Sequence, residues 1–285
     1  MCTMINKGDM RRLPKPLFMQ WLVKETPIVI NGYSCSCYKL DWTVDEKLLE
    51  DWALHIRRHY IRDDYLSKLT SFRKISTAEY LQKYKIPQFT CKDRGGPRIV
   101  PGDFAEILVA DILQFLDNYI VPRYKQVLRA NPYSSEQGSD VVAYRFVKGS
   151  RQPSGDDEIV IVEVKSAVSR KSDREAVRRI VDAVKGSKKD RDNTRDAMTL
   201  NYLMERSLQE EDWSTAEELK RFLDRGEHPY RESFHSAVTL DAKLLTSRRI
   251  DIPDLEMVAP LGPVVLIKAC NFLNLIKDVY SRCAK

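Results

Sequence analysis

The stretch DDEIVIVEVKSAVSR, residues 156–170, decides the fold. From Ile159 to Val164 nearly every residue is Val or Ile, which is typical of a strand buried on both faces. This strand ends in Glu163-Val164-Lys165, and residues two apart project from the same face of a strand. Charged side chains at the end of a buried strand must be paired, bound to a ligand or part of a site.

A partner strand is predicted directly before this one, over residues 141–147. The connecting loop, KGSRQPSGDD, is rich in turn-forming residues, so the two strands should form an antiparallel hairpin. Asp140 precedes the first strand and follows a Gly138-Ser139 turn. In such a hairpin Asp140 and Glu163 can meet near one edge of the sheet.

The segments on either side alternate between helical and strand patterns. A helix is predicted from Asp103, with Glu106 in its first turn, and Pro122 stops it; a second follows a capping box at Ser172 and Glu175. Further helices are expected over residues 45–60, 199–207, 215–223 and 269–282, and strands over 236–240 and 264–267. The predicted fold class is therefore α/β (α+β), a central mixed β-sheet flanked by helices. We expect residues 1–95 to form an appended, partner-binding region and residues 96–285 to form the main domain.

The composition is that of a globular protein: 43% of the 285 residues are hydrophobic, 31% are charged, and the net charge is +6. Cys35-Ser36-Cys37 has no second cysteine or histidine pair near it, so we expect reduced thiols and no zinc site. The first residues lack the apolar segment of a signal peptide, and no apolar run approaches the ~20 residues needed to cross a bilayer. We expect a cytoplasmic protein without membrane contact.

Asp140, Glu163, Lys165 and the upstream Glu106 have a chemical use in common. Hard divalent cations such as Mg²⁺ (or Mn²⁺) bind carboxylate oxygens, and such ions can activate water against a phosphodiester. A lysine beside them can position that water and offset charge on the phosphorus. Each residue also has a plainer interpretation. Glu106 could complete a capping box with Asp103, Asp140 could bond its own turn, and Glu163 and Lys165 could form a simple ion pair.

The order of these residues resembles the PD-(D/E)xK nuclease superfamily over roughly residues 100–190. The resemblance implies a restriction-endonuclease-like core in which Asp140 and Glu163 are metal ligands. By the same resemblance Lys165 is the catalytic lysine and Glu106 an accessory acidic residue. One departure is that Ser139, not proline, precedes Asp140.

A narrower resemblance covers most of the chain. The stretches HIRRHYIRDDYL, GDFAEILVADIL, GSDVVAYRF and EVK look like the HamA-like nuclease subunit of Hachiman antiphage defence systems. In that family the nuclease is paired with a helicase that restrains it. The resemblance therefore implies a DNA substrate and a helicase (ATPase) partner.

A basic segment follows the EVK motif. Residues 165–195 contain eleven Lys or Arg and five Asp or Glu, so this segment's excess of six equals the net charge of the whole chain. Lys171, Arg174, Arg178 and Lys185 could face a phosphate backbone without reading bases, or could form a solvated helix face.

The sequence thus predicts a metal-dependent deoxyribonuclease. Two alternatives stay open: a catalytically inactive DNA-binding or scaffolding subunit, and a partner-docking protein whose charges form an internal ion-pair network.

Overall fold

The computed structural model describes residues 14–284 except 128, 135–137, 150–151, 193–194 and 224. The predicted hairpin is confirmed. Strands β3 (Val141–Arg145) and β4 (Glu158–Ser166) are antiparallel, with Val141 opposite Val162.

The hairpin lies at one edge of a seven-stranded mixed sheet with the order β3-β4-β5-β7-β2-β1-β6. The other strands are β1 (Leu22–Ile30), β2 (Tyr33–Leu40), β5 (Arg231–Asp241), β6 (Arg249–Ile250) and β7 (Val264–Ala269). Neighbouring strands run parallel from β4 through β5 and β7 to β2, and β1 pairs antiparallel with β2. The predicted class, a mixed sheet flanked by helices, is confirmed.

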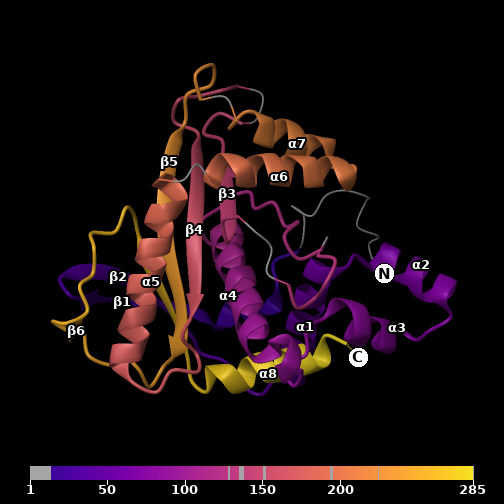
Figure 1. Ribbon diagram of the computed structural model, residues 1–285, viewed down its shortest axis with the longest axis horizontal. Helices are drawn as coiled ribbons and strands as arrows, with labels where there is room; N and C mark the ends of the chain where they lie inside the picture. The colour runs from indigo at the N-terminus through magenta and orange to yellow at the C-terminus, as the bar shows by residue number, and fades with distance from the viewer. Residues whose placement is uncertain are drawn as a thin grey trace.

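Helices cover both faces of this sheet. One core joins α1 (Glu46–Tyr60), α4 (Gly96–Phe115) and α8 (Phe272–Arg282) to the Val160, Val162 and Val164 side of β4. Helix α5 (Asp173–Asp192) packs in a second core on β5 and β7. Helices α6 (Arg195–Gln209) and α7 (Trp213–Lys220) lie side by side across one end of β3, β4 and β5 (Figure 1).

The first 95 residues contribute to the same sheet and the same core. Strand β2 pairs in parallel with β7, and the Trp52 ring of α1 lies 5.0 Å, centroid to centroid, from the Phe104 ring of α4. The region expected to be appended therefore supplies two strands to the common sheet. Its remaining elements are α2 (Asp63–Arg73), α3 (Thr77–Tyr80), the π-helical turn η3 (Leu81–Lys85), and the 3-10 turns η2 (Leu17–Trp21) and η4 (Lys92–Arg94).

The helix predicted to start at Asp103 begins seven residues earlier, at Gly96, and the prediction of its start is wrong. Pro101 lies inside this helix, where it lacks the N–H that would donate to the carbonyl of Pro97. Asp103 is therefore inside the helix, where its carboxylate accepts hydrogen bonds from Arg129 at 2.7 and 3.0 Å. The capping box considered for Asp103 and Glu106 does not form, which removes the plainer interpretation of Glu106.

Within the described residues, none of the helices combines the length and apolar character needed to cross a lipid bilayer.

Candidate active site

The β3–β4 pairing brings Asp140 beside the end of β4. Val141 lies opposite Val162, so Asp140 comes next to Glu163, and its Oδ2 accepts a hydrogen bond from the backbone N–H of Val164 at 2.9 Å. This bond ties the carboxylate to the middle residue of the EVK motif and fixes its orientation.

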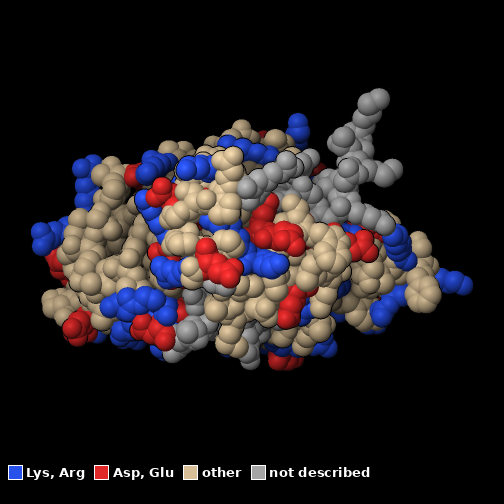
Figure 2. All heavy atoms as spheres, turned by 90° about the horizontal axis from the view of Figure 1, so that it is seen from above, with Lys and Arg blue, Asp and Glu red and all other residues tan. Residues whose placement is uncertain are grey.

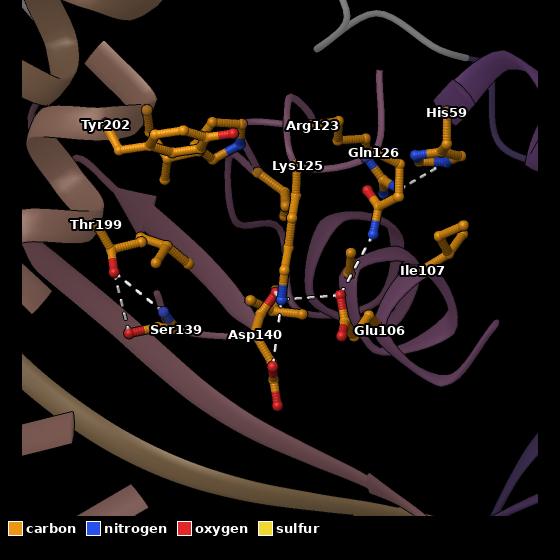
Figure 3. A pocket seen from close by; sticks show the side chains of 16 residues that line it. His59, Glu106, Ile107, Arg123, Lys125, Gln126, Ser139, Asp140, Thr199 and Tyr202 are labelled. Carbon is orange, nitrogen blue, oxygen red and sulfur yellow. Dashed lines mark hydrogen bonds and ion pairs between the residues drawn. The ribbon is translucent and has the colours of Figure 1, made fainter. Parts of the chain in front are cut away.

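Ser139, which stands where the superfamily pattern has proline, uses its backbone N–H. That group donates to Thr199 Oγ1 of α6 at 3.0 Å, a bond that proline could not make. Gly138 has a φ of +108°, and a Cβ there would come within 2.9 Å of the same oxygen. The departure from proline thus anchors the turn before Asp140 to α6 (Figure 3).

Glu163 and Lys165 project from the face of β4 opposite Val162 and Val164, toward α5. Lys165 Nζ donates to Glu163 Oε1, and the Glu163 side chain is 11% exposed. Gly186 of α5 leaves the room for it, since a Cβ at this position would lie 2.6 Å from Glu163 Oε1.

Glu106 reaches the site from α4, on the other face of the sheet. Lys125, in the irregular segment before β3, places its Nζ 3.0 Å from Glu106 Oε2 and 3.2 Å from Asp140 Oδ1 (Figure 3). Gln126 Nε2 also donates to Glu106 Oε2, at 3.3 Å. Sequence reasoning missed Lys125, because its position in VPRYKQV carries no motif; its only signal is a cation between two acidic motif elements.

Burial, with a smaller contribution from mutual repulsion, strongly raises the pKa values of two carboxyl groups of the site. Burial raises the pKa of Glu106 to about 8, and Asp140 adds to this against the attraction of Lys125. Burial, followed by the charge of Asp140, raises the pKa of Glu163 to about 7, opposed by Lys165. Burial alone would lower the pKa values of both lysines, but the carboxylates outweigh it and raise them. Burial is thus the main cause of both carboxyl shifts, and the charge of Asp140 adds to it.

The three carboxylates surround the sheet edge without converging on one point. A different trio is close enough to share one ion: among the described residues, possible ligand atoms of His55, His59 and Asp111 all lie within 4.8 Å of one another. The cavity beside Glu106, Lys125 and Asp140 has a volume of about 40 Å³, which suits a few water-sized particles and no nucleotide. Its donors are carboxylate oxygens, the ligand type that Mg²⁺ and Mn²⁺ prefer.

Among known protein families, the family model described as HamA matches residues 15–278, nearly the whole chain. The chain belongs to the HamA family. It is therefore a protein of the Hachiman defence systems. No curated protein matches it.

The four basic residues predicted to contact a phosphate backbone in this HamA-family chain are all exposed, three on α5 and Lys171 just before it. Arg174 is paired with Asp254, with an Nη2–Oδ2 distance of 2.6 Å, whereas Lys185 directly precedes the Gly186 that contacts Glu163. Arg178 shares the amino-terminal half of α5 with Arg174, and Lys171 precedes the helix. Figure 2 shows the molecule from above, and on that face Lys and Arg side chains are interspersed with Asp and Glu side chains.

A buried polar network, also missed, lies behind the cavity. His55 Nε2 is 3.0 Å from Asp111 Oδ1, His59 Nε2 is 3.3 Å from His55 Nε2, and Arg123 Nη2 is 2.8 Å from Asp111 Oδ1. Burial and the adjacent Arg123 hold the pKa of His59 well below its ordinary value. A guanidinium already stands among these ligands, so the network is better suited to holding Arg123 than to binding a metal ion. The i, i+4 histidines in HIRRHY were the available signal.

Proposed function

We propose that this HamA-family chain is a metal-dependent nuclease of the PD-(D/E)xK type that hydrolyses phosphodiester bonds of DNA. The observation that carries the proposal is the bond between Asp140 Oδ2 and the Val164 N–H, at 2.9 Å. It holds one acidic residue against the strand end that presents Glu163 and Lys165. An isolated E-x-K sequence would be weak support, but an E-x-K strand paired with an aspartate-led strand is specific.

Asp140 and Glu163 would hold Mg²⁺ or Mn²⁺, with Glu106 as an additional oxygen donor. The fit rests on the donor chemistry and on the closeness of the carboxyl groups: burial, and to a smaller extent the charge of Asp140, raises the pKa values of Glu106 and Glu163, and a bound cation would favour their charged forms. The bound ion would make a water molecule more acidic and offset charge on the phosphate.

The protein's own groups would orient the attacking water and the metal-binding carboxylates, and would stabilise charge on the phosphate. Lys165 lies beside Glu163 and keeps its charge, so it can donate hydrogen bonds to a phosphate oxygen or to the attacking water. The Val164 N–H fixes Asp140, and Gly186 lets Glu163 lie flat against α5. Lys185, at the adjacent position of α5, could contact the next phosphate, with Lys171, Arg174 and Arg178 as more distant backbone contacts.

The proposed biological role is that of the effector subunit of an antiphage defence complex, acting in the cytoplasm and restrained by a helicase (ATPase) partner. Membership of the HamA family supports this setting. A free nuclease would damage its host, so restraint is a physical requirement.

A catalytically inactive DNA-binding or scaffolding subunit is the second candidate. Its support is that each acidic side chain of the site already has a lysine partner: Glu163 has Lys165, and Glu106 and Asp140 share Lys125. An intact nuclease must release part of this pairing to hold a metal ion.

The deciding experiment is cleavage of supercoiled plasmid by the full chain, with MgCl₂, MnCl₂ or EDTA, alone and co-expressed with its helicase partner. Glu163→Gln and Lys165→Met are expected to abolish cleavage. The matched control is Glu217→Gln with Lys220→Met, an exposed acid and lysine on α7. If the wild type cuts under none of these conditions while Glu163→Gln still protects cells from phage, the inactive-subunit proposal replaces the nuclease.

A further inference from the structure

We propose that a cleft beside α2, α3 and η3 binds single-stranded nucleic acid, with bases stacked on tyrosine rings and phosphates bound by lysine and arginine. The cleft has a volume of about 660 Å³. That size is in the usual range for pockets that hold organic ligands. The cavity at Glu106 and Asp140 has a volume of about 40 Å³ and cannot hold a nucleotide. A nucleic-acid strand therefore needs another, larger surface on which to bind.

Tyrosine rings supply the stacking surface of this cleft. Tyr65 of α2 is 52% exposed, and Tyr84 of η3 is partly exposed. The Arg73 guanidinium carbon lies 4.6 Å from the centroid of the Tyr84 ring and covers a face of it, so Tyr84 orients a guanidinium plane on which a base can also stack. Bases stack on aromatic faces whatever their identity, so this surface suits a strand without sequence preference.

Three cations of the cleft are available to phosphates. Lys68, Arg73 and Lys85 line it, and within the described residues none of them forms an ion pair. Lys85 is partly buried, and burial lowers its pKa, so an anion at this position would stabilise its charge. Exposed aromatic rings between unpaired cations are the combination found on single-strand-binding surfaces.

The acidic residues of the cleft are only partly compensated. Asp64 Oδ2 and Glu210 Oε2 lie 3.1 and 3.0 Å from the same Arg62 guanidinium, which offsets one of their two charges. Glu211 is the remaining acidic residue that lines the cleft. Lys68, Arg73 and Lys85 therefore carry three positive charges against two negative ones, an excess of one.

The cleft is joined to the candidate active site through two contacts on α4. Arg129 lines the cleft and binds Asp103, while Gln126 lines the small cavity and binds Glu106. Asp103 and Glu106 are three residues apart, which is about 4.5 Å along a helix axis. The cleft thus lies close to the small cavity along α4, with the buried Arg129–Asp103 pair between them. That a strand in the cleft is the substrate of the carboxylates rests on the proposed nuclease function.

The test is fluorescence anisotropy of a fluorescein-labelled oligo(dT) strand of twelve nucleotides with the full chain in EDTA. Tyr65→Leu with Tyr84→Leu should weaken binding by roughly 10-fold or more, because each lost stack weakens binding several-fold or more. Lys68→Gln, Arg73→Gln and Lys85→Gln together should lower the salt dependence, log Kd against log salt, by about 2. The control, Lys243→Gln with Arg248→Gln, changes exposed cations near β6, at the other end of the molecule from α2 (Figure 1).

The outcomes separate the cleft from the nuclease. Weaker binding of an abasic strand or a duplex supports stacking, and an oligo(U) strand distinguishes RNA from DNA. Equal binding of dT and abasic strands, or cleft variants that bind as tightly as the control while circular dichroism shows both folded, overturns the proposal. A chain that binds the strand in EDTA but never cuts with Mg²⁺ keeps the cleft and loses the nuclease.

Discussion

Replacing Lys125 by methionine removes the ammonium group that holds two carboxylates together at the sheet edge. Its Nζ lies 3.0 Å from Glu106 Oε2 and 3.2 Å from Asp140 Oδ1. At an effective dielectric constant near 20, each contact corresponds to a gross attraction of ~5 kcal/mol, most of which offsets the desolvation of the three groups. Removing one partner from a buried pair costs ~3–5 kcal/mol. The three side chains remain 14–19% exposed, so we expect the lower end, about 3 kcal/mol.

The loss of stability should grow with pH. The pKa of Glu106 is already raised to about 8, and without Lys125 it should rise further, so Glu106 can take up a proton at neutral pH and relieve part of the repulsion. Above that pKa this relief is lost. Added MgCl₂ should raise the Tm of Lys125→Met more than that of the wild type, because the vacated carboxylates become a better cation site.

Urea unfolding at pH 6 and pH 9, with and without MgCl₂, measures these effects. Lys148→Met, at an exposed lysine, is the control, and Glu106→Gln completes a double-mutant cycle. If Lys125→Met differs from Lys148→Met by less than ~0.5 kcal/mol at both pH values, the ammonium does not hold the carboxylates and the reasoning fails.

Three further predictions address other parts of the site. Because Glu163 has a pKa of about 7 in the folded chain against an ordinary 4.5, its stabilising contribution is complete below pH 4.5. Without divalent cations Glu163 should therefore lower the free energy of unfolding by up to ~3 kcal/mol as the pH rises from 4.5 through 7; in a urea series Glu163→Gln should lose this share of the slope and keep the share that comes from the raised pKa of Glu106. Gly186→Ala should displace Glu163 and reduce plasmid cleavage at least ~10-fold with little change in Tm, whereas Gly155→Ala, with no neighbour within 4 Å, should cut normally; equal cleavage by both variants would count against the packing argument. Asp111→Asn should lower the free energy of unfolding by ~3 kcal/mol, because Arg123, 2.8 Å away, loses the charge that compensates its burial; a loss below ~1 kcal/mol in urea would contradict this.

Local sequence was enough to predict the strands that build the site. A continuous run of Val and Ile and a turn-rich loop predicted the hairpin, and the two-residue period of a strand put Glu163 and Lys165 on one face. The position of Asp140 beside Glu163 followed from the hairpin, because the pairing of two strands joined by a short loop is decided by nearby residues. The start of α4 was misjudged because Pro101 and Asp103 resemble a helix boundary in isolation, while tertiary packing extends the helix to Gly96.

Long-range contacts were out of reach of such reasoning. Lys125 belongs to no periodic segment, and its two partners, Glu106 and Asp140, are 19 and 15 residues away in the chain. The pairing of β2 with β7 joins residues more than 200 positions apart and decides that the amino-terminal strands share the main sheet. No local pattern specifies either contact.

The sequence by itself therefore determined the hairpin, the direction of the EVK side chains and the membership of a mixed α/β class, because these depend on neighbours within a few residues. The tertiary structure alone decided that the acidic side chains lie on two faces of the sheet. It also decided that Lys125 stands between two of them, and that Arg123 is held by buried histidines and Asp111. The physical reason is that charge shifts, burial and ion pairing are properties of groups brought together by folding, and their strength depends on distances that the order of residues does not contain.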